Sequence, residues 1–159
     1  MSRRDQIQMS EEEQREFLAS GHTAILTSIS DDGLPHPTAM FYVVVDGLAW
    51  FATYARSQKI VNFRRNPAAA VLVEDGKRYE ELRGLLIQGR ADVRDGDPEM
   101  TYRIYRGLYE KYTAGAPIEG DLPEAAEEFV RRASSKRVAV AVVPERVASW
   151  DHHKLGGTY

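Results

Sequence analysis

Short turns join most of the apolar segments in the first 96 residues, and this constrains the fold more than any other feature. Asp31-Asp32-Gly33, Asp46-Gly47 and Asp75-Gly76 are turn sequences between segments rich in apolar and β-branched residues. Such short connections suit antiparallel neighbours, whereas parallel strands need a crossover of a dozen or more residues. The spacing therefore predicts a β-rich α+β chain whose antiparallel meander closes into a small barrel, and not a doubly wound parallel sheet.

The apolar pattern predicts six strands and four helices. Residues 34–45 and 48–53 are expected to form a hairpin around Asp46-Gly47. The other strands are expected at 23–30, 68–73, 81–93 and 138–143. Helices are expected at 10–20 and 57–65, from Asp97-Pro98 onward, and from Asp121, which we expect to cap the last helix.

Length and composition indicate a single domain over residues 1–159. The net charge of −3 gives no basic field that would favour nucleic acid. The chain has no cysteine, which excludes disulfides, thiolate metal sites and cysteine nucleophiles. Neither end has an apolar run long enough for a signal peptide or a membrane span, so we expect a cytoplasmic protein without a membrane partner.

The start of the predicted helix at 57–65 is a candidate anion site. Ser57 is a favourable N-cap residue, and Arg56 and Lys59 lie beside N–H groups that already attract negative charge. A strand end followed by such a helix can hold a flat ligand by its phosphate. From spacing alone, an ordinary capped helix with solvated charges explains the same residues equally well.

Four motifs follow one another along most of the chain. They are Asp32-Gly33-Leu34-Pro35-His36-Pro37, then Thr53 with Ser57-Gln58-Lys59 and Asn62, then Leu82-Arg83-Gly84 with Gln88-Gly89-Arg90, and finally Ser149-Trp150-Asp151. In this order they resemble the flavin and deazaflavin oxidoreductases related to pyridoxamine 5′-phosphate oxidase. The resemblance is greater to the branch that uses the deazaflavin coenzyme F420.

This resemblance implies an FMN-binding-like split β-barrel with peripheral helices, which forms a homodimer with cofactor sites at the subunit interface. It implies that the cofactor meets one strand, the end of a second strand, a helix start and the C-terminal segment. The expected contacts are His36, Pro37, Thr38, Ala39, Met40, Thr53, Tyr54, Arg56, Ser57, Lys59, Asn62 and Trp150. An anionic cofactor tail would then pass Arg56, Arg64 or Arg65.

Several of these residues have a second, structural interpretation. His36 is equally compatible with a surface position at a strand entry, and Tyr54 with simple packing. Asn62 can bond locally within its helix, and Trp150 can seal the barrel. Four tyrosines at 102, 105, 109 and 112 suggest either a ligand-stacking stripe or the edge of a core.

The resemblance predicts an F420-dependent reductase that passes a hydride to an unsaturated small-molecule substrate. One alternative is an FMN-binding oxidase or flavin reductase, and another is a non-catalytic small-molecule binder on the same barrel. No residue is assigned as catalytic, because no proton donor stands out. No metal site is expected, since the adjacent His152 and His153 would point to opposite faces of a strand.

Overall fold

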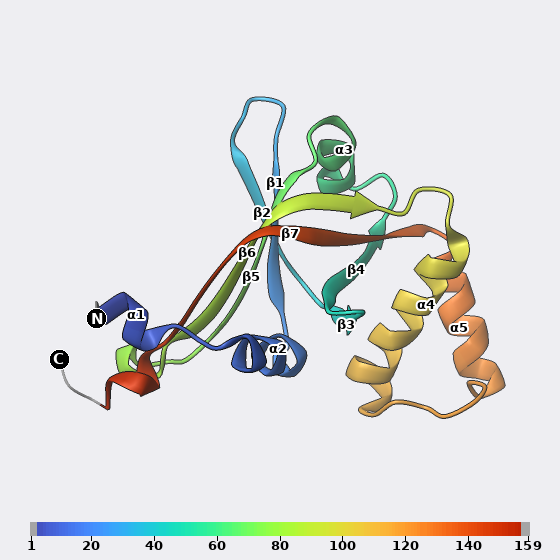
Figure 1. Ribbon diagram of the computed structural model, residues 1–159. Helices are drawn as coiled ribbons and strands as arrows, with labels where there is room; N and C mark the ends of the chain where they lie inside the picture. The colour runs from blue at the N-terminus through green and yellow to red at the C-terminus, as the bar shows by residue number, and fades with distance from the viewer. Residues whose placement is uncertain (1–2, 157–159) are drawn as a thin grey trace.

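A computed structural model describes residues 3–156, which form one antiparallel seven-stranded sheet and five α-helices (Figure 1). The strands are β1 (Ala24–Ile29), β2 (Pro35–Met40), β3 (Val43–Val45), β4 (Leu48–Tyr54), β5 (Ala68–Asp75), β6 (Arg83–Val93) and β7 (Arg137–Asp151). The helices are α1 (Arg3–Ile7), α2 (Glu11–Ser20), α3 (Gln58–Arg65), α4 (Pro98–Tyr109) and α5 (Glu124–Ser134). A π-helical segment at Glu110–Ala114 extends α4, and short 3₁₀ turns lie at Tyr79–Glu81 and His152–Leu155.

The strand order shows how the sheet curls into a split barrel. The order is β2-β1-β5-β6-β7-β4-β3, so β2 and β3 are the two outer strands. They are consecutive in the chain, because only Phe41 and Tyr42 separate Met40 from Val43. The outer strands therefore meet within three Cα–Cα steps of about 3.8 Å each, and this requires the sheet to close on itself. The predicted β-rich split barrel with peripheral helices is confirmed.

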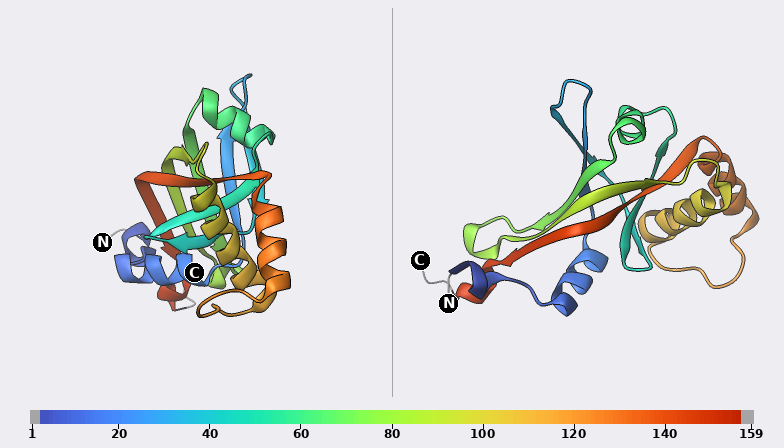
Figure 2. Two further views of the ribbon diagram at one scale, coloured as in Figure 1. Left: turned by 90° about the vertical axis from the view of Figure 1, so that its right-hand side faces the viewer. Right: turned by 45° about the horizontal axis from the view of Figure 1, so that its top comes forward.

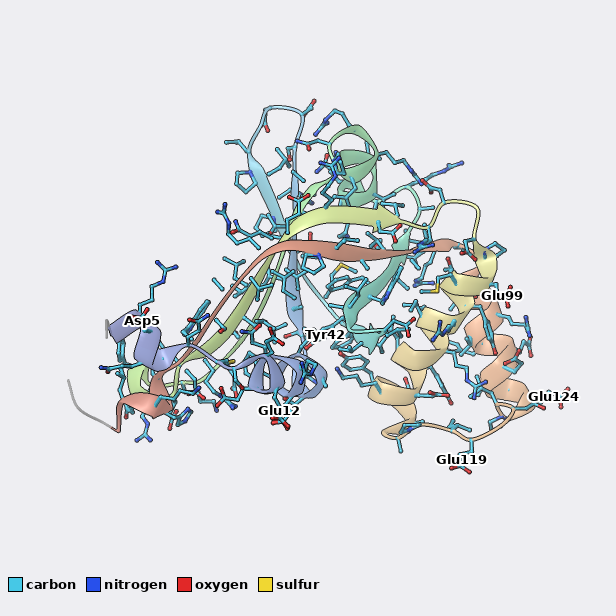
Figure 3. The ribbon with its side chains drawn as sticks, in the orientation of Figure 1. Asp5, Glu12, Tyr42, Glu99, Glu119 and Glu124 are labelled. Carbon is cyan, nitrogen blue, oxygen red and sulfur yellow. The ribbon has the colours of Figure 1, made fainter. Side chains whose placement is uncertain are left out.

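The hairpin expected at residues 34–53 was partly wrong. β2 pairs with β1 over its whole length, and only β3 pairs with the start of β4. The break falls at Tyr42, whose side chain is fully buried and whose hydroxyl donates to the carbonyl of Leu18 at 2.5 Å. Figure 3 shows Tyr42 beside the end of α2. Burial of this tyrosine between α2 and the sheet therefore divides the apolar run into two strands.

β7 is longer than predicted, and it forms with β6 a ribbon that spans the molecule. The pairing shifts register between Gln88 and Gly89, opposite Pro144, so the proline lies at a β-bulge rather than ending the strand. A side chain at Gly89 would overlap the carbonyl oxygen of Val143, so the bulge needs glycine here. Figure 2 shows α1 and α2 towards one end of this ribbon and α4 with α5 at the other.

The last helix also begins later than predicted. Pro123 and not Asp121 occupies the N-cap position of α5, and the cap makes no side-chain hydrogen bond. Proline fits near a helix start because the first N–H groups have no partner within the helix. Every helix in the described part of the chain is too short or too polar to span a membrane.

Candidate functional site

A pocket of about 550 Å³ brings together four of the predicted site residues. It is called the ring pocket below. Thr38, Ala39 and Met40 of β2 line it together with Lys59 of α3. The rest of its lining comes from Phe41, Ala52, Tyr105, Leu108, Tyr109, Tyr112, Thr113, Phe129 and Arg137. The outer strand β2 thus lines a pocket that the α4–α5 pair helps to enclose.

The hydroxyl of Thr38 is a polar group in this pocket without a partner. Its oxygen is buried and makes no hydrogen bond within residues 3–156. Buried polar atoms in folded proteins are nearly always hydrogen-bonded, and an exception calls for an explanation. A polar ligand atom in the ring pocket would satisfy this hydroxyl.

Lys59 lies at the start of α3 among hydroxyl groups. Its ammonium group lies 3.5 Å from the Thr53 hydroxyl, which in turn lies 3.4 Å from the Ser57 hydroxyl. Within the described residues no carboxylate forms an ion pair with Lys59. Partial burial lowers the pKa of Lys59, because removal from water disfavours the charged form. The cation therefore lacks the counter-charge that an anionic ligand would provide.

The N-terminus of α3 is not capped by a side chain. Ser57 holds the N-cap position, as predicted, but its hydroxyl makes no capping hydrogen bond and lies near Thr53 instead. The first N–H groups of a helix have no intrahelical partner and carry partial positive charge. Thr53, Ser57, Lys59 and this helix end, together called the polar cluster, form an arrangement suited to a phosphate.

Aromatic side chains form the opposite wall of the ring pocket. Phe129 of α5 packs near Tyr105 and Tyr109, with ring centroids 6.4 and 6.0 Å apart. Phe41 and Tyr112 stack at 4.3 Å. Half of the surface of Phe41 and of Phe129 stays exposed, at 51% and 52%. Tyr105, Tyr109 and Tyr112 therefore line the pocket. Tyr102, Tyr105 and Tyr109 also pack against the buried cluster of residues 122, 126 and 130, so the structure supports the core-edge interpretation for these three.

The π-helical segment ties this aromatic wall to the β2–β3 junction. The Tyr112 hydroxyl donates to the carbonyl of His22 at 2.7 Å and accepts from the amide of Tyr42 at 3.2 Å. The ammonium of Lys111 donates to the carbonyl of Gly21 at 2.8 Å and lies 4.4 Å from the centre of the Tyr42 ring. Sequence reasoning missed these contacts, because an inserted π turn leaves no periodic signal.

Other predicted residues lie beside the pocket or elsewhere. His36 is half-buried and Pro37 exposed, both on β2 but outside the pocket lining. Arg56 is exposed. Tyr54 is also exposed, and the Arg137 guanidinium lies over its ring at 4.4 Å. None of these four predicted residues lines the ring pocket.

Asn62 is fully buried, and both polar atoms of its side chain are engaged. Its amide nitrogen donates to the Ser28 hydroxyl and its oxygen accepts from Gln58, each at 2.9 Å. Two nearby arginines are also held by the fold. Arg64 forms a two-bond ion pair with Asp95, and Arg65 donates to the carbonyl of Ile29.

Trp150 lies far from the polar cluster within one chain. It sits near the end of β7, opposite Gly84 of β6, and its indole occupies the space that a side chain at Gly84 would fill. Figure 1 shows this end of β7 beside α1, across the molecule from α4 and α5. Contact with a cofactor would therefore have to involve the site of another subunit.

No metal centre is evident in the described residues. Among residues 3–156, no three His, Cys, Asp or Glu side chains are grouped so that they could hold a metal ion. Asp151 accepts from the ring of His153 at 2.8 Å, while the ring of His152 contacts the carbonyl of Tyr79 at 2.7 Å. The two histidines thus bond to different partners.

Comparison with known proteins identifies the family. The model of a family described as pyridoxamine 5′-phosphate oxidase matches residues 10–151. A crystal structure of a conserved hypothetical protein from Mycobacterium tuberculosis is 40% identical, with a TM-score of 0.88, and the match covers 100% of this chain and 95% of that one. A comparison with curated proteins gave no match.

More distant structures share the fold. A protein titled F420 reductase is 24% identical with a TM-score of 0.61, over 84% of this chain and 94% of that chain. An FAD-binding protein from Mesorhizobium loti is 19% identical with a TM-score of 0.64, over 89% of this chain and 94% of that chain. The family predicted from the four motifs is confirmed. The chain belongs to the pyridoxamine 5′-phosphate oxidase family.

Proposed function

We propose that this protein is an oxidoreductase that binds coenzyme F420 and reduces an unsaturated small organic molecule. The observation that carries the proposal is the ring pocket, where β2, an aromatic wall and the polar cluster at α3 meet. A flat ring with a phosphate side chain has both an apolar and an anionic part, and this pocket offers a surface for each.

The pocket fits such a group in size and in chemistry. Its volume of about 550 Å³ falls within the 300–1,000 Å³ typical of small-molecule sites. Lys59 would neutralise a phosphate as a point charge, and Ser57 with the α3 N–H groups would donate hydrogen bonds to it. Thr38 has an unpaired hydroxyl to offer to a polar edge of the ring.

The chain's own role would be binding and orientation. A reduced deazaflavin supplies a hydride when bound. Phe41 and Phe129 would cover the ring and exclude water, while Thr38 and Lys59 would fix its position from two sides. Holding the donor and acceptor carbons about 3–3.5 Å apart removes a large part of the activation barrier to hydride transfer. No side chain is assigned as the proton donor.

FMN is the second candidate cofactor. The family description and the FAD-binding neighbour favour a flavin, whereas the neighbour titled F420 reductase favours a deazaflavin. The polar cluster would serve the phosphate of either. A binding protein without catalysis on the same barrel is the third possibility, and the missing proton donor favours it.

We further propose that two copies assemble and that each site uses both. A groove of about 640 Å³ runs between α2 and the β6–β7 ribbon, and Leu85, Ile87, Val142 and Val147 contribute to it. Val147 and Val143 remain 42% and 45% exposed, which leaves apolar surface for a second chain to cover.

A chain without cysteine is also compatible with the cytoplasmic location that we expect.

Cofactor binding tests the proposal directly. Purified protein should quench the fluorescence of added F420, and it should consume reduced F420 only when an activated enone or quinone is present. Yellow protein with two visible flavin bands and peroxide release would instead establish the FMN oxidase. Tight binding without turnover across a broad acceptor panel would support the carrier.

A further inference from the structure

A second recess adjoins the ring pocket and carries three cations. It measures about 540 Å³, and its lining includes Tyr54, Phe129, Arg132, Lys136 and Arg137. Phe129 and Arg137 also line the ring pocket, so the two hollows share a boundary. We propose that this basic recess holds a polyanionic extension of a ligand whose flat ring lies in the ring pocket. The inference rests on the proposed function.

The charges of the basic recess are available to a ligand. Arg132 and Lys136 are exposed, and in the part of the chain that the structure describes neither cationic side chain forms an ion pair or a hydrogen bond. Glu128 is the one acidic residue in the described lining, so cations exceed acids there by three to one. The recess therefore has an excess of positive charge.

Arg137 is fixed at the boundary between the two hollows. Its guanidinium donates to the carbonyl of Ala133 at 2.5 Å, and it lies over the rings of Tyr54 and Tyr105 at 4.4 and 4.9 Å. Stacking orders this cation before any ligand arrives, so little side-chain entropy is lost on binding. An anionic chain that leaves the ring pocket would meet this charge first.

The basic recess offers an anionic tail a second course beside the predicted one past Arg56, Arg64 or Arg65. Arg64 and Arg65 were expected beside such a tail, but Asp95 and the carbonyl of Ile29 engage them. Arg56 stays exposed and follows Ala55, whose amide bonds to the carbonyl of Lys136 at 3.4 Å. Arg56 therefore follows a residue that is bonded to the edge of the recess, and the recess adds three cations near the end of α5 to Lys59 at the start of α3.

Three cations in one recess suit several anionic groups in a chain better than a single carboxylate. Carboxylates or phosphates of the cofactor's own tail meet this description, and so does an anionic substrate. Figure 3 shows Glu119 and Glu124 at the far end of the α4–α5 pair, so of the acidic residues in this part of the chain only Glu128 lines the recess. The cofactor tail and an anionic substrate share this chemistry, and ligands with and without the tail distinguish them.

The test compares ligands with and without the anionic tail. The double variant Arg132→Ala/Lys136→Ala is titrated with oligoglutamyl F420 and with the deazaflavin that lacks phosphate and tail, by fluorescence quenching. We expect affinity for F420 to fall about tenfold or more and affinity for the truncated deazaflavin to change less than twofold. The salt dependence of F420 binding should also become weaker.

Arg131→Ala is the matched control. Arg131 is the neighbouring cation on α5, but it pairs with Glu127 at 2.5 Å and lies over the Tyr102 ring. Its loss also removes a cation from the end of α5 but none from the lining of the recess, so it should leave F420 affinity within twofold. Equal affinity of the double variant and the parent for F420, or an equal loss in the control, would overturn a cofactor tail as the occupant.

Two further measurements keep this test separate from that of the proposed function. If the parent binds no deazaflavin, calorimetry with free oligo-γ-glutamate tests the recess alone, and weaker binding to the double variant would support it. If FMN is the cofactor, a rise in KM confined to anionic acceptors would assign the recess to substrate. Unchanged binding of every anionic probe in the double variant would overturn the inference.

Discussion

Lys59 makes the most direct prediction at the scale of single residues. Lys59→Ala should weaken binding of a phosphate-bearing cofactor by roughly 1.5–3 kcal/mol, as for a charge-assisted hydrogen bond. Burial already lowers the pKa of Lys59 below 10.5. Because an anion needs the protonated form, affinity should fall as pH rises through this lowered pKa. An arginine stays protonated over this pH range, so the affinity of the Lys59→Arg variant for the cofactor should not change with pH.

The unliganded protein should respond to pH in the opposite direction at the same residue. The unfolded chain holds the Lys59 proton more tightly than the folded chain, so the lysine's contribution to the free energy of unfolding rises as pH increases through the lowered pKa. Denaturation and binding measured together between about pH 7 and 10 would show both trends. Binding that is independent of pH in the parent would contradict the assigned role.

Asn62 tests whether a predicted contact residue is structural. Its side chain joins α3 to Ser28 of β1 inside the barrel. Asn62→Ala should lower the free energy of unfolding by about 1–3 kcal/mol, because the buried Ser28 hydroxyl loses its partner. Ser28→Ala in the Asn62→Ala background should add little further destabilisation. Urea denaturation of the parent, the two single variants and the double variant measures the coupling between the two side chains. Full stability with weaker cofactor binding would make Asn62 a ligand contact instead.

At the scale of elements, turn and cap residues predicted most of the fold. The three turns predicted the antiparallel pairs β1–β2, β3–β4 and β5–β6, and α2 begins at the capping box of Ser10 and Glu13. The errors lie where tertiary contacts override local signals, as at Tyr42, whose burial breaks the strand expected at 34–45. The aromatic wall could be suspected from tyrosine spacing, but no local pattern shows that Phe129 would meet it.

Gly84 tests the packing between β6 and β7. A methyl group there would overlap the Trp150 indole, so Gly84→Ala should destabilise the fold by about 1–3 kcal/mol and shift the tryptophan fluorescence. The destabilisation caused by Gly84→Ala should be much smaller in a Trp150→Ala background. Gly107→Ala is the control, because its new methyl group would meet Val43 only at 3.5 Å. An equal loss with and without Trp150 would show that backbone strain, not the indole, requires glycine.

For the whole molecule, exposed apolar surface on β7 predicts a dimer. Val147 lines the groove beside α2 and leaves 42% of its surface accessible, and Val143, outside that lining, leaves 45%. Light scattering at micromolar concentration should give twice the mass of the 17.9 kDa chain. Val147→Glu should shift the equilibrium towards monomer, since a buried unpaired charge is costly. Leu34→Glu, at the exposed turn between β1 and β2, should leave the dimer intact. A monomeric parent protein would remove the shared-site proposal.

Subunit mixing then tests whether Trp150 serves the site of the partner. α3, which carries Lys59, and the end of β7, which carries Trp150, lie apart in one chain (Figure 1), so a shared site would combine Lys59 of one copy with Trp150 of the other. Lys59→Ala and Trp150→Ala dimers should each have low turnover. After exchange at equal concentrations, half of the dimers are mixed and each has one intact site, so about a quarter of the parent turnover should return. Crosslinked dimers of each variant, which cannot exchange, are the control. If mixing gives only the average of the two variants, each chain supplies its own site and Trp150 has a structural role within it.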